Sequence, residues 1–352
     1  MKKKVVFISL LKSISDPRID KFFSTLSQSF VNCEFHIIAT DDSTQSKYNA
    51  LPLEPKSNRS QKRKKALSYL KGINPDIVIF NNIDLITSLL RIPKTTLLYD
   101  IRENHIRNIY YQSNYPWYKK TILIPSILSL EFFSTFFIRH YFLAEQCYKK
   151  QLSHISKRKT TILENKALDI SYSPTSTRLH FIISGSLSRN YGTIEAIKWF
   201  KEYQIIEPFA TLIVIGKTYN ISYHQEIQNE CIHPGIKINI SNESIPYLTI
   251  KNEITQADIG IMSYQNNKSF KDKVPTKLYE YISAGKIVVS ADHSPINTGD
   301  NNVIRIEIAN YQEQTLERVK EKLAKSNAQL NPNTSWESEK QKLIDEFKKI
   351  LV

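Results

Sequence analysis

The stretch "KVPTKLYEYISAGKIVVSAD" at 273–292 places a lysine and a glutamate three residues apart between apolar runs. A proline suits the first turn of a helix and a glycine suits its left-handed end. The spacing therefore predicts a helix that begins at Pro275 and stops at Gly285, followed by a buried strand. Lys277 and Glu280 would lie on this short helix, close to its beginning.

The beginning of this helix is a candidate anion site. The preceding strand, "ADIGIMSY", ends near Tyr264, so the next loop brings the helix N-terminus to the carboxyl edge of the sheet. Backbone N–H groups at 274–277 and the helix dipole favour a phosphate there, and Lys277 adds a full positive charge. Glu280, one turn further on, can accept hydrogen bonds from paired hydroxyls such as those of a ribose. Taken alone, each charge also fits a solvated helix surface.

The elements that must position these residues form an alternating pattern of strands and helices. Strands are predicted at "KVVFISL", "EFHIIAT", "DIVIF", "TTLLYDI", "HYFLA", "TTILEN", "LHFIISG", "TLIVIGK", "IKINIS", "IGIMSY" and "KIVVSAD". Helical patterns include 17–30, 60–72, 192–204, 276–284 and 310–326, and the polar segments 41–65 and 323–335 are predicted loops. Nearly continuous apolar strands separated by helices indicate parallel sheets that are covered on both faces. Two such sets in series predict an α/β protein with two Rossmann-like, doubly wound domains.

A polar segment at 164–178 is the predicted hinge between the two domains. We expect an N-terminal domain at 1–168 and a C-terminal domain at 172–330. The last segment, 335–352, has an apolar stripe at helical spacing, which needs a surface to cover. That stripe consists of Trp336, Leu343, Phe347 and Ile350.

Charge is distributed unevenly along the chain. The net charge is +14, and the residues up to 172 carry 27 Lys/Arg against 14 Asp/Glu. This imbalance indicates an anionic partner for the first half, either nucleic acid or an anionic membrane surface. The basic run "NRSQKRKK" at 58–65 lacks interleaved aromatic residues, and no nucleic-acid-binding module is apparent. We therefore expect a membrane surface and no nucleic acid.

The most hydrophobic stretch is "TILIPSILSLEFFSTFFIRHYFLA" at 121–144. Four interruptions exclude a membrane span, namely Pro125, Glu131, Arg139 and His140. The favoured interpretation is a buried helix followed by a core strand. The alternative is a helix that dips into the membrane interface, flanked by Trp117, Tyr118, Lys119 and Lys120.

The cysteines and the N-terminus indicate a cytoplasmic protein. Three widely spaced cysteines fit neither a disulfide framework nor a zinc site. The start "MKKKVVFISLLKS" is interrupted by Lys12 and has no small-residue cleavage site, so it predicts a first strand rather than a signal peptide.

The segment around 272–285 resembles the donor-binding region of GT-B glycosyltransferases of the family 4 group. That group commonly has "P-x-K-L-x-E-Y-x-x-x-G-x-x-V" here, and Pro275, Lys277 and Glu280 match it. The resemblance implies that Pro275, Thr276 and Lys277 hold the donor diphosphate and that Glu280 holds the ribose. The family's first acidic residue, usually Glu, is Asp272 here, with an implied catalytic role beside the donor sugar.

Other segments resemble the same family in the expected order, so the resemblance spans nearly the whole chain. They are "SDPRIDKFFSTLS" (15–27), "YDIRENH" (99–105), "ILEN" (162–165) and "ISGSLSRNYGTIEAI" (183–197). In the last of these, Ser186 and Tyr191 stand where the family often has Arg and Lys, with Arg189 between them. In this last segment the resemblance implies donor binding by Gly185, Ser186 and Arg189. In the segment 99–105 it implies catalytic roles for Asp100, Glu103 and Arg102, which stands in place of the usual His. The implied acceptor or cleft residues are Asp16, Arg18 and His105.

The resemblance implies the GT-B fold, with the C-terminal helix (335–352) crossing back to an N-terminal acceptor domain. It implies transfer of a sugar from a nucleoside-diphosphate sugar to a glycan or lipid-linked glycan in bacterial surface polysaccharide assembly. We expect a retaining, metal-independent reaction with no tightly bound cofactor, on the inner face of the plasma membrane. The alternatives are a nucleotide-sugar epimerase of the same fold, a phosphorylase, for which no pyridoxal phosphate lysine stands out, and a non-catalytic basic binding protein.

Overall fold

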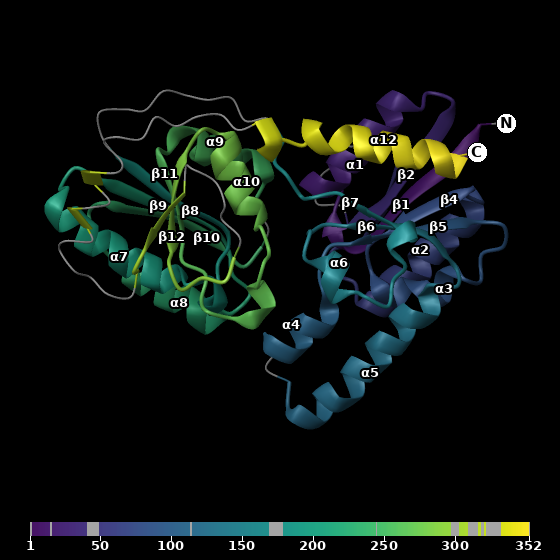
Figure 1. The fold of residues 1–352 in the computed structure, drawn as a ribbon, viewed down its shortest axis with the longest axis horizontal. Helices are drawn as coiled ribbons and strands as arrows, with labels where there is room; N and C mark the ends of the chain where they lie inside the picture. The colour runs from purple at the N-terminus through teal and green to yellow at the C-terminus, as the bar shows by residue number, and fades with distance from the viewer. Residues whose placement is uncertain are drawn as a thin grey trace. The chain divides into compact units, whose positions relative to one another are not determined.

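The computed structural model describes residues 2–14, 16–40, 49–112, 115–168, 179–243, 245–296, 303–308, 316–317, 320–321 and 332–351. The chain forms two compact units (Figure 1). Unit 1 comprises Met1–Asn165 and Glu339–Val352, and unit 2 comprises Lys166–Ser338.

Unit 1 is built on a seven-stranded parallel sheet in the order β3-β2-β1-β4-β5-β6-β7. Its strands are β1 (Lys3–Ser13), β2 (Cys33–Thr40), β3 (Asn49–Leu53), β4 (Ile77–Phe80), β5 (Thr96–Ile101), β6 (Ile138–Leu143) and β7 (Thr160–Ile162). Its α-helices are α1 (Pro17–Ser29), α2 (Arg59–Ile73), α3 (Ile86–Leu89), α4 (His105–Tyr111), α5 (Trp117–Ser134), α6 (Tyr148–Gln151) and α12 (Glu337–Leu351). Short 3-10 turns lie at Ile83–Leu85 and Lys157–Lys159.

Unit 2 repeats the same winding on a six-stranded parallel sheet in the order β10-β9-β8-β11-β12-β13. Its strands are β8 (His180–Ser186), β9 (Thr211–Lys217), β10 (Ile236–Ser241), β11 (Ile259–Met262), β12 (Ile287–Ala291) and β13 (Val303–Ile306). Its α-helices are α7 (Thr193–Ile206), α8 (Ile221–Glu230), α9 (Tyr247–Gln256) and α10 (Thr276–Ser283). Its 3-10 turns lie at Arg189–Tyr191, Lys268–Phe270 and Pro332–Thr334.

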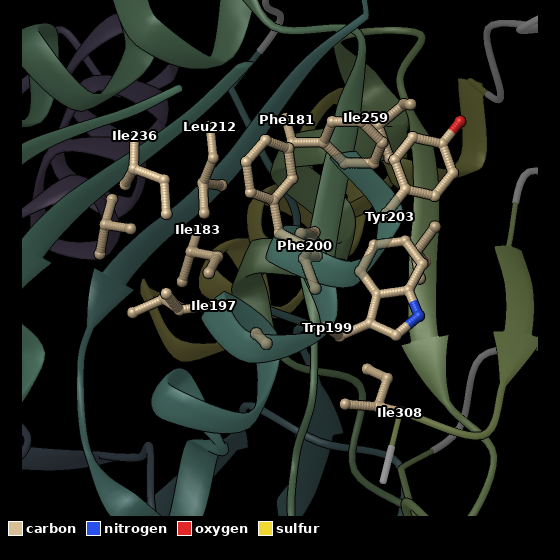
Figure 2. Packing of buried hydrophobic residues seen from close by; sticks show 14 of the residues in the cluster. Phe181, Ile183, Ile197, Trp199, Phe200, Tyr203, Leu212, Ile236, Ile259 and Ile308 are labelled. Carbon is tan, nitrogen blue, oxygen red and sulfur yellow. The ribbon is translucent and has the colours of Figure 1, made fainter. Parts of the chain in front are cut away.

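Aromatic side chains fill the core of unit 2 between β8 and α7. Phe181 on β8 packs against Phe200, with 5.3 Å between the ring centroids (Figure 2). On the same helix, the rings of Trp199 and Tyr203 stack at 5.3 Å. These four side chains are 0–1% exposed, so they fix α7 against the sheet whose carboxyl edge carries the candidate site.

The C-terminal helix, α12, packs within unit 1, as predicted. Leu343 and Phe347 on its apolar stripe are both 0% exposed. The ring of Phe347 lies 5.1 Å from that of Phe30, and Glu346 lies 3.4 Å from the His140 imidazole on β6. The chain therefore leaves unit 1 near 165 and returns to it at 339.

The predicted α/β architecture is confirmed, and all eleven predicted strands are present. Two strands were missed: β3, which falls in a predicted loop, and β13, which has four residues. Both pair with one neighbour at a sheet edge, and such strands need no continuous apolar run. Most of the predicted helix at 310–326 and of the predicted hinge lies outside the described residues.

The prediction of a buried helix in the apolar stretch 121–144 is wrong, although β6, which follows, is the predicted core strand. Within α5, Glu131 and Ser134 are the buried residues, and most apolar side chains of the helix are exposed or half-buried. No element of the described part of unit 1 covers the outer face of this helix, so its hydrophobicity did not lead to burial.

Candidate functional site

The candidate donor site lies where the sheet of unit 2 changes its direction of winding. β8 pairs with β9 on one side and with β11 on the other, so successive connections run in opposite directions from this point. In doubly wound sheets, ligands bind beside the carboxyl ends of the strands at such a point. The two segments that leave these ends are the one after Ser186 and the one after Met262.

The two segments meet at Lys277. Its Nζ donates a hydrogen bond to the carbonyl oxygen of Ser186, at 3.2 Å, and lies 5.4 Å from the centre of the Tyr191 ring. Gly185 has a φ of +86°, and a Cβ there would lie 3.0 Å from Lys277 Cε. A glycine is therefore required at 185 both by the backbone conformation and by the approach of the lysine.

Packing under α10 holds this helix in place. The Tyr281 hydroxyl bonds to the backbone N–H of Ser184 at 3.1 Å and to its Oγ at 2.9 Å. The Tyr281 ring lies over Gly260 of β11, where a Cβ would collide with it. Tyr281 is 0% exposed, so α10 is fixed to both strands at the switch point.

The N-terminus of α10 lies beside Lys277, as the sequence predicts. The helix begins at Thr276, Pro275 is its N-cap residue with a ψ of 142°, and no side chain caps this end. Gly285, with a φ of +71°, follows the helix in the predicted left-handed conformation. A helix N-terminus combined with a lysine is suited to an anion such as a phosphate.

The pKa of Lys277 is shifted by the surroundings of its ammonium group. Burial lowers the pKa of Lys277 to about 8, and the Glu280 carboxylate opposes this shift. Among the described residues no carboxylate lies within ion-pair distance of its ammonium group. Burial also raises the pKa of Tyr247 well above its usual range, and Glu280 raises it further, so this tyrosine belongs to the same neighbourhood.

Asp272 precedes the helix in an exposed loop. Its backbone is in the left-handed region, with a φ of +63°, and its N–H donates to the Pro295 carbonyl at 3.0 Å. Aspartate is among the residues that tolerate this conformation best. The loop geometry thus explains the residue type, and its predicted catalytic role stays a prediction.

The side chain of Arg189 contacts α8 and not Lys277. Its guanidinium pairs with Glu226 of α8 and lies 4.9 Å from the centre of the Tyr223 ring. The side chain is 64% exposed. Its predicted role in donor binding is untested, and the contacts of the described residues do not bring it together with Lys277.

Four predicted site residues of unit 1 form a closed ionic network at the carboxyl end of β5: the catalytic candidates Asp100 and Arg102 and the acceptor or cleft candidates Asp16 and Arg18. Asp100 accepts from Arg18 Nη2 at 2.6 Å and from Arg102 Nε at 3.0 Å. Arg18 Nη1 also donates to the Leu163 carbonyl at 2.9 Å, which ties β5 to the chain that leaves β7. Asp16 caps α1 through the N–H groups of Arg18 and Ile19 and accepts from Arg102 Nη1 at 2.9 Å.

Two arginines and two aspartates thus neutralise one another. Burial raises the pKa of Asp100, but Arg18 and Arg102 outweigh it and hold the pKa below its usual value. Burial likewise raises the pKa of Asp16, and Arg102 and Lys12 reverse that shift. Asp100 is 0% exposed, so its described contacts are those of a residue that positions two guanidinium groups.

Glu103 and His105 lie on the segment that follows this network. Glu103 is exposed and accepts from Asn108 Nδ2 at 3.1 Å, and His105 is the first residue of α4. No described contact joins either side chain to Asp100. Their predicted roles remain untested.

Sequence reasoning missed two residues of the unit 2 site. It treated Tyr191 as a departure from a family pattern, yet the structure places this ring against Lys277. It did not consider Tyr247, which starts α9 and lies close enough to Glu280 for its pKa to respond to that carboxylate. Neither residue carries a local spacing signal.

No protein-family model matches this sequence, and no curated protein matches it either. Solved structures do match. Sucrose-phosphate synthase from Thermosynechococcus elongatus is 10% identical with a TM-score of 0.71, and 99% of each chain is covered. WaaG, a glycosyltransferase involved in lipopolysaccharide biosynthesis, is 12% identical with a TM-score of 0.59, over 97% of this chain and 95% of that one.

The chain has the GT-B fold. The UDP-GlcNAc 2-epimerase of Methanocaldococcus jannaschii is also similar, at 11% identity and a TM-score of 0.57, over 98% of this chain and 99% of that one. At these identities the likeness shows the GT-B fold and leaves the activity to be argued from the site. In the described part of the chain, no group of three or more His, Cys, Asp or Glu side chains is arranged to hold a metal ion.

Proposed function

We propose that this protein is a glycosyltransferase that moves a sugar from a nucleoside-diphosphate sugar to a glycan or lipid-linked glycan. The observation that carries the proposal is Lys277, placed at the N-terminus of α10 and at the switch point of the unit 2 sheet. This position combines a cation, a helix dipole and backbone N–H groups at the place where such sheets bind phosphorylated ligands.

The proposed chemistry is stabilisation of a departing diphosphate. Lys277 and the N-terminus of α10 would oppose the negative charge that develops on the leaving group. Glu280 would accept hydrogen bonds from the ribose hydroxyls, and Asp272 would contact the donor sugar. Because these groups supply the compensating charge, we propose a metal-independent reaction that needs no bound cofactor. We also propose that the reaction retains the anomeric configuration, as the resemblance to the family 4 group implies.

We further propose that unit 1 binds the acceptor at the inner face of a bacterial plasma membrane during surface polysaccharide assembly, such as that of a capsule or an O-antigen. The likeness to WaaG, involved in lipopolysaccharide biosynthesis, supports this assignment. The excess of Lys and Arg in the first half of the chain supports it too, since each basic residue near an anionic leaflet contributes about 1 kcal/mol. Among the described residues, no helix is long and apolar enough to cross a bilayer.

A second candidate is a nucleotide-sugar epimerase, which the likeness to UDP-GlcNAc 2-epimerase favours. Both activities use the same donor site, so binding alone does not separate them. An epimerase converts its nucleotide sugar with no acceptor present. A transferase consumes the donor only when an acceptor or water takes the sugar.

The first experiment is a thermal-shift and calorimetric panel with UDP, GDP, dTDP and ADP. We expect one of them to stabilise the protein, by about 2.7 kcal/mol at a ligand concentration 100 times the dissociation constant. Lys277→Ala should weaken that ligand by about tenfold or more, because a charge-assisted hydrogen bond is lost. Lys237→Ala removes the same charge from an exposed position on β10 and should change nothing.

Failure of all four nucleotides to bind would contradict the proposal and favour a non-catalytic protein. Equal affinity of Lys277→Ala and the unsubstituted protein would show that the diphosphate lies elsewhere. Glu280→Ala should lower affinity for the nucleoside diphosphate more than affinity for inorganic pyrophosphate, because the proposed contact of this carboxylate is with the ribose, which pyrophosphate lacks.

A further inference from the structure

Helix α5 carries apolar residues on both of its sides: Ile127 and Leu130 pack against the core of unit 1, and other large apolar residues face outward. Its buried residues are Glu131 and Ser134, while large apolar residues such as Phe132 and Leu128 are 54% and 43% exposed. A helix on the surface of a soluble domain normally turns its apolar stripe to the core and its polar residues to water. The outer side of α5 departs from this rule, because large apolar residues are exposed there beside Thr121, Ser126 and Ser129.

The inner face of α5 is held by specific polar contacts. Glu131 Oε2 lies 3.1 Å from His154 Nε2, and Ser134 Oγ lies 2.9 Å from the Tyr141 hydroxyl. Lys159 Nζ donates to the carbonyl of Thr135, which follows the helix, at 2.8 Å. These contacts fix the rotation of the C-terminal half of α5, so the outward direction of Leu128, Phe132 and Phe133 is built into unit 1.

The outward side chains form one concentrated apolar surface. Of the twenty large hydrophobic side chains that are exposed in the described residues, eleven lie between 110 and 137. We call them the α4–α5 surface: Tyr110, Tyr111, Tyr115, Trp117, Tyr118, Ile122, Leu128, Phe132, Phe133, Phe136 and Phe137. Figure 1 shows α5 extending outward from the helices that cover the sheet of unit 1. Such concentrations on a protein surface mark binding sites.

The exposed charges of residues 104–144 are all positive. Between 104 and 144 the basic residues are Arg107, Lys119, Lys120 and Arg139, against a single acid, Glu131, which is 2% exposed and faces the protein. Lys120 also donates to the Tyr110 carbonyl at 3.0 Å, which joins α4 to α5. The exposed part of the segment is therefore apolar and cationic, with no exposed carboxylate.

We propose that the α4–α5 surface inserts into the interfacial layer of an anionic lipid bilayer. Tyrosine and tryptophan at the beginning of α5, phenylalanine at and just beyond its other end, and lysines beside the tryptophan are the composition that lies at the boundary between headgroups and acyl chains. The proposal rests on the proposed membrane location of the acceptor, and it assigns that location to a particular surface. A second copy of this chain would bring a second surface of the same positive charge against this one, which like-charge repulsion opposes.

Trp117 gives a direct probe of this contact. The chain has three tryptophans, and Trp117 is 76% exposed while Trp199 and Trp336 are 0% and 3% exposed. With vesicles of phosphatidylcholine and phosphatidylglycerol, we expect its fluorescence to shift to shorter wavelength and to be quenched by brominated acyl chains. Trp117→Phe should remove both changes. Binding without any quenching would overturn insertion.

Paired variants test the apolar contribution. Phe132→Ser with Phe136→Ser should weaken vesicle binding by about tenfold or more, since interfacial binding scales with the apolar area buried. The matched control is Ile205→Ser with Phe209→Ser in unit 2, whose side chains are 71% and 70% exposed, and it should bind like the unsubstituted protein. Melting temperatures of both variants check that they fold. If the first variant does not fold, quenching of Trp117 in the unsubstituted protein decides.

Three results would overturn the proposal. The first is no binding to anionic vesicles, and the second is unchanged vesicle binding of the Phe132/Phe136 variant. The third is that the unsubstituted protein forms a dimer without lipid and this variant does not. The last would assign the surface to a second copy of the chain. These assays contain no nucleotide, so their failure would leave donor binding by unit 2 untouched. Failure of the nucleotide panel would likewise leave the vesicle result standing.

Discussion

The two units wind their parallel sheets in the same order, yet the carboxyl edges of the two sheets carry opposite electrostatic arrangements. In unit 1, Asp100 and Asp16 neutralise Arg18 and Arg102 inside the protein. In unit 2, Lys277 has a carbonyl and an aromatic ring for neighbours and no carboxylate within ion-pair distance among the described residues. The charges at the edge of the unit 1 sheet are paired with one another. At the edge of the unit 2 sheet, Lys277 is a positive charge with which a bound anion could pair. The same topology thus supports a closed ionic network in unit 1 and the proposed anion site in unit 2.

Breaking the network of unit 1 should have the largest effect on stability. Asp100→Ala leaves the buried Arg18 guanidinium without a carboxylate and Arg102 with Asp16 alone, so the free energy of unfolding should fall by about 3–5 kcal/mol. Urea unfolding of the purified variant measures this. Asp84→Ala, which breaks an ion pair with Arg59 whose side chains are 28% and 50% exposed, is the control and should cost at most about 1 kcal/mol. Equal effects of the two substitutions would remove the contrast between a closed network and an ordinary surface pair.

A smaller effect is expected at the glycine beside Lys277. Gly185→Ala puts a Cβ 3.0 Å from Lys277 Cε on a backbone with a φ of +86°. We expect a loss of roughly 1–2 kcal/mol in the free energy of unfolding, together with weaker nucleotide binding as the lysine shifts. Denaturant unfolding and calorimetry measure the two effects.

Gly72→Ala in α2 is the matched control, because no heavy atom lies within 4 Å of the added Cβ. It should leave nucleotide affinity unchanged and stabilise the helix by up to about 1 kcal/mol. If Gly185→Ala behaved like this control, the close approach of Lys277 to the β8 segment would be wrong.

Local rules were sufficient to predict the unit 2 helix from sequence. Proline and glycine mark the ends of α10, and the apolar runs on either side mark β11 and β12, so Lys277 had to lie at the edge of a sheet. The network of unit 1 was not predictable in this way. Asp100 and Arg18 are 82 residues apart in the sequence, and nothing in either local sequence indicates that the Asp100 carboxylate forms a buried ion pair with an arginine.

The exposure of α5 was missed for a different reason. Hydrophobicity predicts that the apolar side chains of a segment will be buried against some surface. It does not say whether that surface belongs to the same chain or to a partner such as a membrane. The signals that set the direction of α5 are Glu131 and Ser134 on its inner face. Their partners, His154 and Tyr141, become neighbours only through the fold of unit 1.

The central claim is that a charged Lys277 completes the diphosphate site, and the pH dependence of nucleotide affinity tests it most directly. With a pKa of about 8 in the free protein, Lys277 is largely protonated at pH 7 and largely neutral at pH 9. A bound diphosphate favours the charged form, so affinity should fall about twofold between pH 7 and pH 8 and about tenfold in all between pH 7 and pH 9. Lys277→Ala should bind weakly and show no such fall. Calorimetric titrations in which both proteins lost affinity in parallel, or in which the unsubstituted protein bound equally at pH 7 and pH 9.5, would contradict the account.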